Sequence, residues 1–362
     1  MITKGDDFPI HQTSSPIAEV GSERNFYDRY FFNGYNDDGS IFFGAAFCVY
    51  PNLNVKDASF IFVSEGIQHN FRYSDVLDYE RMETSVGSFK IEIIKPLKEI
   101  RIILNDEEKD INVDVTFSGR FEPMEEPRMT LRNGPRIYMD STRMTQHGHW
   151  TGNINFKSHN INLSEENYLG TRDRSWGIRP VGTQDTQIVP PLKLPQFYWL
   201  WAPANFDDVS SHLYFVDDEE GRATHSHCVE QKDNQSSILS SLKKEIHYYE
   251  GTRRISKAKF SAMKQDKTEV VWSLKPKYHI YMCGLGYMHP EWGHGMYHGE
   301  QKSFYDSYDL SEDPHDPPFL HIQAICHFEM KENDTTTKGL GVLEQLLIGP
   351  HIPSGFESLL DR

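Results

Sequence analysis

Apolar and polar residues alternate with a period of two along most of the chain, and turn residues interrupt the alternation at short intervals. Such a period places successive side chains on opposite faces of a strand, so it predicts antiparallel β-strands. The segment "RNFYDRYFFNGYNDDGSIFFGAAFCVY" is typical of a hairpin whose turn lies at 36–39. Strands that recur every 8 to 12 residues or so are typical of a β-sandwich or a β-barrel.

The second half of the chain repeats this pattern, and a proline-rich stretch, "VPPLKLPQ" at 189–196, separates the two halves. Proline has no N–H to donate to a sheet, so the first set of strands is expected to end near it. We therefore expect two all-β domains, 1–185 and 186–362, each an antiparallel barrel or sandwich with few short helices. The clearest helix signal is Ser354, which is placed to cap a short helix in "SGFESLLDR".

Charge and composition narrow the classes of partner. The 362 residues include 37 Lys and Arg against 53 Asp and Glu, a formal net charge of -16. This surplus repels phosphate backbones and anionic lipid, so we expect no nucleic-acid partner. No run of about 18 apolar residues occurs, so we expect no stable membrane insertion. The sequence leaves open whether the protein forms a homodimer.

The start of the chain, "MITKGDDFPIHQ", has neither a basic nor an apolar stretch of the kind found in signal peptides. No two cysteines form a C-x-x-C pair, which favours buried thiols in a reducing compartment. We therefore expect a cytoplasmic protein. The cysteines are Cys48, Cys228, Cys283 and Cys326.

The stretch "GTRDRSWGIRP" at 170–180 brings three arginines, an acid and an indole together. It resembles the pattern G-x-R-D-H-S-W-G-x-R of a lipocalin-like superfamily with two tandem β-barrel domains. That superfamily includes carotenoid 1,2-hydratases (hydroxyneurosporene synthases) and relatives of no assigned activity. "FYWLWAP", "GYMHPEWGHG" and "GLGVLEQLLIGP" match it further, in order, over both halves of the chain. Arg174 stands where the pattern usually has His.

The resemblance implies a catalytic acid at Asp173, assisted by His147 or His149 and by Trp150, all three from "HGHW". Hydration of an alkene needs a strong acid, protection for a cation and a positioned water. A carboxyl buried in an apolar cavity stays protonated near neutral pH, indole faces stabilise a cation, and imidazole orients water. Neither a metal nor an organic cofactor is required.

Strand geometry leaves an alternative open for Asp173. In a regular strand Arg172 and Arg174 face one side and Asp173 the other, so Asp173 and Trp176 share a cavity only if a bulge intervenes. The alternative is an ion pair of Asp173 with Arg172, Arg179 or another cation, which would lower its pKa and disable it as an acid.

Other stretches supply candidate contacts to a ligand. The cluster "HPEWGHGMYHGE" contains His289, Glu291, His294, His298 and Glu300, but its H-x4-H-x3-H spacing matches no common zinc signature, so we expect a loop with ligand contacts and no metal. In "FYWLWAP" one strand face belongs to a core and the other can line a cavity. The expected substrate-binding residues are Trp150, Trp176, Arg172, Tyr198, Trp199, Trp201, His294, His298 and Glu344.

These observations favour a cofactor-independent enzyme of hydro-lyase or isomerase type. Its expected substrate is a small hydrophobic molecule, such as an isoprenoid, steroid-like or polyene compound, on which it hydrates, dehydrates or isomerises a C=C bond. The alternatives are a shape-directed cyclase and a carrier that encloses a hydrophobic ligand without changing it. No G-x-S-x-G, Walker, H-E-x-x-H or kinase pattern occurs.

Overall fold

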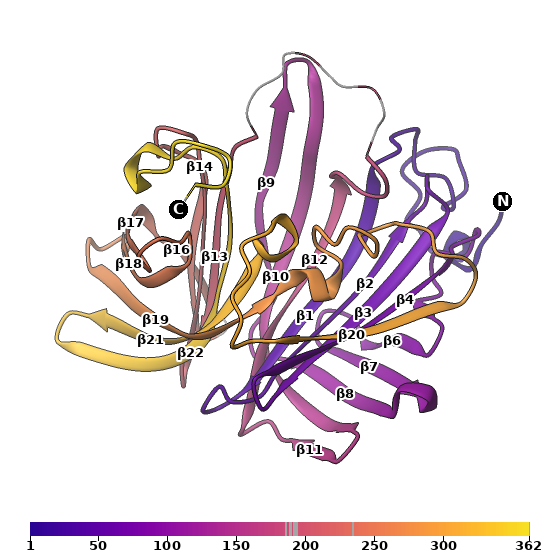
Figure 1. Ribbon diagram of the computed structural model, residues 1–362, viewed down its shortest axis with the longest axis horizontal. Helices are drawn as coiled ribbons and strands as arrows, with labels where there is room; N and C mark the ends of the chain where they lie inside the picture. Colours follow the sequence, from indigo (N-terminus) through magenta and orange to yellow (C-terminus); the bar gives the residue numbers. More distant parts are fainter. Residues whose placement is uncertain (185–186, 188–189, 191–194, 234, 362) are drawn as a thin grey trace. The chain divides into compact units, whose positions relative to one another are not determined.

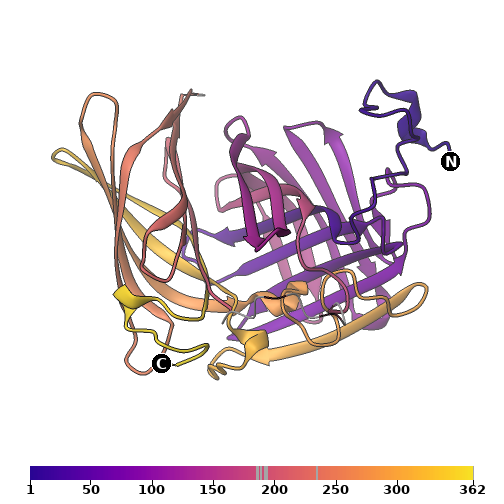
Figure 2. The same cartoon turned by 90° about the horizontal axis from the view of Figure 1, so that it is seen from above.

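The computed structural model describes residues 1–184, 187, 190, 195–233 and 235–361. Most of the expected linker at 189–196 lies outside these residues. The described backbone forms two curled antiparallel sheets, which confirms the all-β prediction (Figures 1 and 2). The helix expected near the C-terminus is wrong, because only Ile352–Ser354 forms a 3-10 turn there. The other 3-10 turns are Lys4–Asp7, Glu107–Lys109, Met282–Leu285 and Pro317–Phe319.

The first sheet has 13 strands in the order β20-β4-β3-β2-β1-β12-β10-β8-β7-β6-β5, and β9 and β11 also pair with β10. Its β5 end approaches β3 and β4, so the sheet curls around an interior. The strands are β1 (Phe26–Asn36), β2 (Phe42–Tyr50), β3 (Val55–Ser64), β4 (Ile67–Val76), β5 (Ser85–Val86), β6 (Phe89–Lys95), β7 (Glu99–Asp106), β8 (Ile111–Gly119), β9 (Met124–Asn133), β10 (Arg136–Phe156), β11 (His159–Leu163), β12 (Tyr168–Ile178) and β20 (Lys302–Asp309).

The second sheet has nine strands in the order β16-β15-β14-β13-β22-β21-β19-β18-β17. Its two ends approach each other through β15 and β17, so it also curls, as Figure 2 shows. The strands are β13 (Phe197–Asn205), β14 (Val209–Asp217), β15 (Ala223–Lys232), β16 (Gln235–Ile238), β17 (Ser240–Tyr248), β18 (Ile255–Met263), β19 (Glu269–Tyr281), β21 (Ile322–Glu332) and β22 (Thr335–Ile348).

The two compact units of the chain are each discontinuous in sequence. One comprises residues 1–36, 41–191 and 283–309, and the other comprises 37–40, 192–282 and 310–362. The sequence predicts a single cut after residue 185, and the structure differs because 283–309 belongs to the first unit. Within that segment, β20 pairs with β4 over its whole length, as the orange strand in Figure 1 shows.

A row of glycines crosses the middle of the first sheet. Gly34 of β1 lies opposite Gly170 of β12, which lies opposite Gly148 of β10, which lies opposite Gly119 of β8. Large side chains cover this row: a Cβ at Gly170 would lie 2.4 Å from Nε1 of Trp150. Cβ atoms at Gly34 and Gly148 would lie 2.2 Å from the rings of Phe43 and Phe117. These positions need glycine because the interior rings occupy the space of a side chain.

The core of each unit lies on one face of its sheet. In the first unit the alternate β1 residues Tyr30 and Phe32 point inward, where they join a cluster of buried aromatic and aliphatic side chains. In the second unit Tyr198 and Leu200 of β13 belong to the core cluster. The expected division of "FYWLWAP" into a core face and a second face is therefore confirmed.

We predict that Gly170→Ala lowers the free energy of unfolding by about 2 kcal/mol or more, since the new Cβ overlaps an interior ring and the backbone. It would lie 2.1 Å from the carbonyl oxygen of Asn33. Gly44→Ala is the matched control in β2, because its closest contact, 3.2 Å, is to the Ile61 side chain, which can shift. Chemical denaturation measures both, and equal losses would contradict the steric argument.

Candidate functional site

The first unit contains a cavity of about 360 Å³, within the range of small-molecule sites, and it is partly open to solvent because the Ile10, Met82 and Ile93 side chains of its wall are exposed. Its wall is mostly apolar, and its polar groups come from β1, from β12 and from the turn after β4. The apolar side chains are Ile10, Ile17, Phe47, Val49, Met82 and Ile93. The others are Asp28, Tyr30, Arg81, Thr84 and Arg174.

Asp28 is the carboxylate of this cavity and is ion-paired with two guanidinium groups. The nearest nitrogen of Arg174 lies 2.7 Å from its Oδ1, and that of Arg81 lies 3.6 Å from its Oδ2. Arg174 and Tyr30 are directly opposite each other in the β1–β12 ladder, so both side chains point inward. Arg172, which the sequence predicts to bind substrate, is not among the residues that line the cavity, in contrast to Arg174. Arg172 is 2 % exposed, and it donates to Gln146 over 2.8 Å.

Tyr30 connects the charged cluster to the aromatic core. The Arg174 guanidinium stacks on its ring with 3.8 Å between the guanidinium carbon and the ring centroid. Burial is the main cause that raises the pKa of Tyr30, so its phenol keeps its proton at neutral pH. The described cavity wall therefore includes one carboxylate, two permanent cations and, besides the Thr84 hydroxyl, the Tyr30 phenol as a hydrogen-bond donor.

An N-terminal segment, residues 1–24, supplies part of the cavity wall through Ile10 and Ile17. The Asp6 carboxylate holds this segment together, accepting from the backbone N–H of Thr3 at 2.6 Å and of Ile17 at 2.9 Å. Arg81 connects the segment to the charged cluster, since it also donates to the Ile17 carbonyl over 3.0 Å. We call residues 1–24 the N-terminal strap.

Asp173 lies on the other face of β12. The ladders of β12 with β1 and β10 run without a bulge, and Asp173 is directly opposite Thr145. Asp173 and Trp176 therefore face opposite sides, and the expected shared cavity is wrong. Trp176 itself is 39 % exposed. The predicted separation of Asp173 from Arg174 is confirmed.

The face that carries Asp173 has its own polar group. The hydroxyl of Thr145 donates to buried Glu126 over 2.6 Å, and Arg143 lies 3.3 Å from the same carboxylate. His147 and His149 share this face, because β10 alternates in step with β12. His147 is fully buried, and Nδ1 of His149 lies 3.0 Å from the carbonyl oxygen of Glu165.

Trp150, which the sequence predicts to bind substrate, lies in the core of the first unit. It is fully buried over the glycine row, and its indole N–H donates to the Asn33 carbonyl over 2.9 Å. Its ring packs edge-on against those of Phe43 and Phe117. Trp150 is therefore a core residue of the first unit.

The histidines of 289–300 contact their own loop or other residues of the first unit. His294 contacts Arg29 at 2.5 Å and Arg179 at 2.8 Å through its two ring nitrogens. The ring of His298 stacks on Trp292 with 3.8 Å between centroids. Nδ1 of His289 accepts from the backbone of residues 291 and 292. In the described part of the chain, no three His, Cys, Asp or Glu side chains form a group that could hold a metal ion.

The expected ligand contacts of the second unit fall on both faces of its sheet. Tyr198 is a core residue whose hydroxyl lies 2.8 Å from that of Tyr248. On the other face, Trp199 donates to Glu344 over 3.1 Å, and His321 lies 2.7 Å from the same carboxylate. Trp201, 2 % exposed, shares the face of Trp199. Glu344 thus orders neighbouring polar groups.

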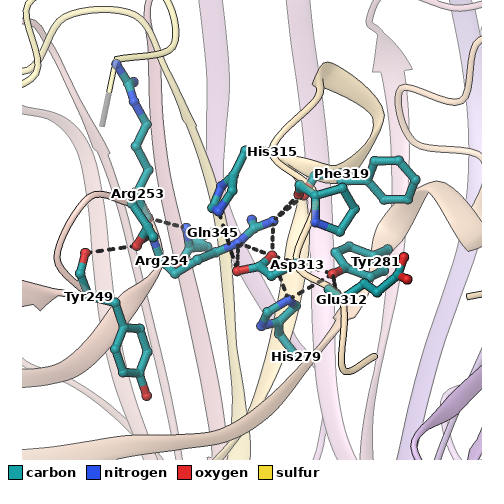
Figure 3. Close-up of polar contacts among 12 residues, drawn as sticks. Tyr249, Arg253, Arg254, His279, Tyr281, Glu312, Asp313, His315, Phe319 and Gln345 are labelled. Carbon is teal, nitrogen blue, oxygen red and sulfur yellow. Dashed lines mark hydrogen bonds and ion pairs between the residues drawn. The ribbon is translucent and has the colours of Figure 1, made fainter. Parts of the chain in front are cut away.

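A second charged cluster, shown in Figure 3, lies in the second unit. Buried Arg254 donates to Asp313 from Nη2 over 2.8 Å, and Nε2 of His279 lies 3.3 Å from the same oxygen. Arg254 also donates to the Phe319 carbonyl over 2.9 Å. Burial alone would raise the pKa of Asp313, but hydrogen bonds from His279 and Arg254 outweigh it and hold that pKa below its usual range. The cluster anchors the 310–321 segment to β19 and to the residue directly before β18.

Comparison with known proteins places these features in a family. The model of a family of unknown function, DUF8625, matches residues 2–357. The chain belongs to this family. A search of curated proteins finds no match. Among the described residues of this DUF8625 chain, the helical turns are all too short to cross a bilayer.

Solved structures share the two-domain fold of this DUF8625 protein at low identity. The AttH-type protein NE1406 of Nitrosomonas europaea has a TM-score of 0.53 and 10 % identity, over 94 % of this chain and 99 % of its own. Kievitone hydratase of Nectria haematococca has a TM-score of 0.53 and 10 % identity, over 96 % of each chain. CghA has a TM-score of 0.54 and 9 % identity, over 90 % of this chain and 88 % of its own. The expected lipocalin-like architecture is confirmed.

The sequence pattern did not single out the cavity residues Asp28, Tyr30 and Arg81. A signal was present, because Asp28 is a charged residue in the inward series that continues with Tyr30 and Phe32. Arg174 is a second inward charge, at the position where the family pattern has His. Two opposite charges at inward positions of neighbouring strands indicate a buried pair.

We predict that Asp6→Asn loosens the N-terminal strap, because Thr3 and Ile17 donate to different oxygens of Asp6 and the amide keeps only one acceptor oxygen. Limited proteolysis should cut residues 7–16 faster, with little change in the melting temperature of the remaining chain. Asp7→Asn, an exposed neighbour, is the control. Equal cleavage of both variants would contradict a role of Asp6 in holding the strap.

We predict that Asp313→Asn destabilises the second unit by about 1 to 3 kcal/mol, because buried Arg254 loses its carboxylate partner. The pKa of Asp313 is lowered in the folded chain, so its contribution is present above the ordinary value of 3.8 and is lost as the pH falls below it. Denaturation from pH 7 to pH 3 measures this against Asp316→Asn, an exposed control. Parallel curves for wild type and Asp313→Asn would contradict the prediction.

Proposed function

We propose that this protein is a cofactor-independent enzyme of hydratase or isomerase type that acts on a small, largely apolar molecule in the cavity of the first unit. The observation that carries the proposal is the Asp28–Arg174–Arg81 cluster in an apolar wall. A carrier of an apolar ligand does not need charged groups in its apolar wall, whereas proton transfer needs a group that accepts a proton. Kievitone hydratase shares the fold, which is consistent with the proposal.

The cluster favours a basic role over the acid role expected of Asp173. The Asp28 carboxylate is the group of the cavity wall that can accept a proton from substrate. The Tyr30 phenol and the Arg174 guanidinium are donors, suited to the negative charge that develops on an enolate oxygen. The substrate this chemistry requires is an alkene conjugated to a carbonyl or carboxyl group.

The proposed reaction is a proton shift or an addition of water on that conjugated system. In isomerisation, Asp28 removes a proton from carbon, the electron pair moves to the conjugated oxygen, and the proton returns at another carbon. In hydration, Asp28 takes a proton from water, hydroxide adds to the β-carbon, and the α-carbon then receives the proton. Both sequences regenerate the carboxylate.

The experiment compares Asp28→Asn with Asp173→Asn, which alter the two faces of the same sheet. A panel of apolar unsaturated acids, ketones and esters is incubated with each protein in ¹⁸O-labelled or deuterated water. Mass spectrometry detects solvent atoms in the product. We expect Asp28→Asn to lower turnover by at least about 100-fold, as for loss of a general base, and Asp173→Asn to change it little.

Other outcomes separate the alternatives. Loss of turnover in Asp173→Asn alone would assign the reaction to the face that carries Asp173, His147 and Glu126, as the sequence comparison implies. Ligands that bind the cavity without gaining solvent atoms would favour the carrier. Tyr30→Phe is a second cavity variant with intact ion pairs, so it covers the case in which Asp28→Asn does not fold.

A further inference from the structure

The cavity of the first unit has a surplus of positive charge. Its lining residues include two guanidinium groups, Arg174 and Arg81, and one carboxylate, Asp28. These three side chains are 17 to 25 % exposed, so they are largely removed from water, and a cation in such a place is normally paired. The described lining therefore lacks one negative charge.

Arg81 has a donor that remains available. It donates from Nη1 to the Ile17 carbonyl over 3.0 Å and lies 3.6 Å from Asp28 through Nη2. Its Nε–H is buried and makes no hydrogen bond within the described residues. A buried donor without an acceptor costs about 1 to 3 kcal/mol, so a ligand acceptor here would be strongly favoured.

A third inward arginine adds to the surplus. Arg172 lies two residues before Arg174 on the same strand face, and one of its terminal nitrogens, Nη2, is buried without a hydrogen-bond partner among the described residues. Burial, followed by the charge of Arg174, lowers the pKa of Arg172 to about 10. Two neighbouring cations on the inner face of one strand repel each other, and an anion near Arg174 would relieve that repulsion.

The geometry points to an amphipathic anion as the ligand of this cavity: a molecule with an apolar body and one anionic group bound by Arg174 and Arg81. The inference rests on the proposed function and narrows it, because the group that activates the alkene is then a carboxylate or a similar anion. The planar guanidinium fork suits an anion with two oxygens. The apolar body packs among the aliphatic wall residues, including Val49 and Met82.

The test uses two fluorescent probes that share an apolar skeleton and differ in charge. These are 1-anilinonaphthalene-8-sulfonate and neutral N-phenyl-1-naphthylamine. Each is titrated against the full chain, its Arg174→Gln and Asp28→Asn variants, and Arg128→Gln, which alters an exposed arginine of the same unit. Val49→Trp, which fills the cavity, identifies binding that takes place inside it.

We expect Arg174→Gln to weaken binding of the sulfonate probe by at least about 10-fold, because one charge-assisted hydrogen bond is lost. Binding of the neutral probe should weaken by less than about 3-fold. Asp28→Asn should tighten the sulfonate probe, because it removes the carboxylate that repels it. A partly unfolded variant also binds this sulfonate more strongly, so near-UV circular dichroism first establishes that each variant keeps its tertiary packing. Arg128→Gln should change neither probe.

Two failures are distinguishable. If both probes bind in the cavity and Arg174→Gln weakens them equally, the charge inference is overturned while a cavity for apolar molecules stands. If Val49→Trp leaves both probes unchanged, the cavity binds neither, and the proposed function fails with it. Should Arg174→Gln not fold, Arg81→Gln tests the other cation of the cavity, and unchanged sulfonate affinity there contradicts the inference.

Discussion

The glycine row across β1, β12, β10 and β8 is the constraint on which the first unit depends. At each of its positions an interior side chain lies where a Cβ would be, and Phe43, Phe117 and Trp150 fill the centre of the curled sheet. This packing leaves no ligand space at that level. The cavity instead lies on the Asp28 side of the layer, where β1, β2 and β12 supply its wall.

The same constraint determines which charges enter the interior. With the glycines opposite one another, the register of β1 and β12 places Tyr30 across from Arg174 and Phe32 across from Arg172. Both arginines therefore point inward with the aromatic rings. Asp28, two residues before Tyr30, is then the carboxylate in position to pair with Arg174. The position of the cavity and its charge thus follow from one register.

Alternation along the chain was sufficient to predict the strands, the faces of "FYWLWAP" and the separation of Asp173 from Arg174, because each follows from the period of two. The position of β20 was not predictable in this way. Its partner β4 lies far away in sequence, and the charged and aromatic residues of 302–309 fit many edges. The core position of Trp150 was not predictable, because an indole in a motif is equally compatible with a ligand-binding wall and with a core. The structure shows that its ring packs over Gly170, where a side chain would overlap it.

The sign of the cavity charge also decides between two kinds of alkene chemistry. One uncompensated guanidinium roughly 6 Å away would raise the free energy of a carbocation by about 3 kcal/mol at an effective dielectric constant near 20. Such an increase slows the reaction about a hundredfold. An enolate at the same distance is stabilised by a similar amount. Indole stabilisation of a cation, about 0.5 to 2 kcal/mol per ring, does not offset this, and Trp150 and Trp176 are absent from the described cavity wall. The positive charge of the cavity therefore favours a reaction that passes through an anionic intermediate.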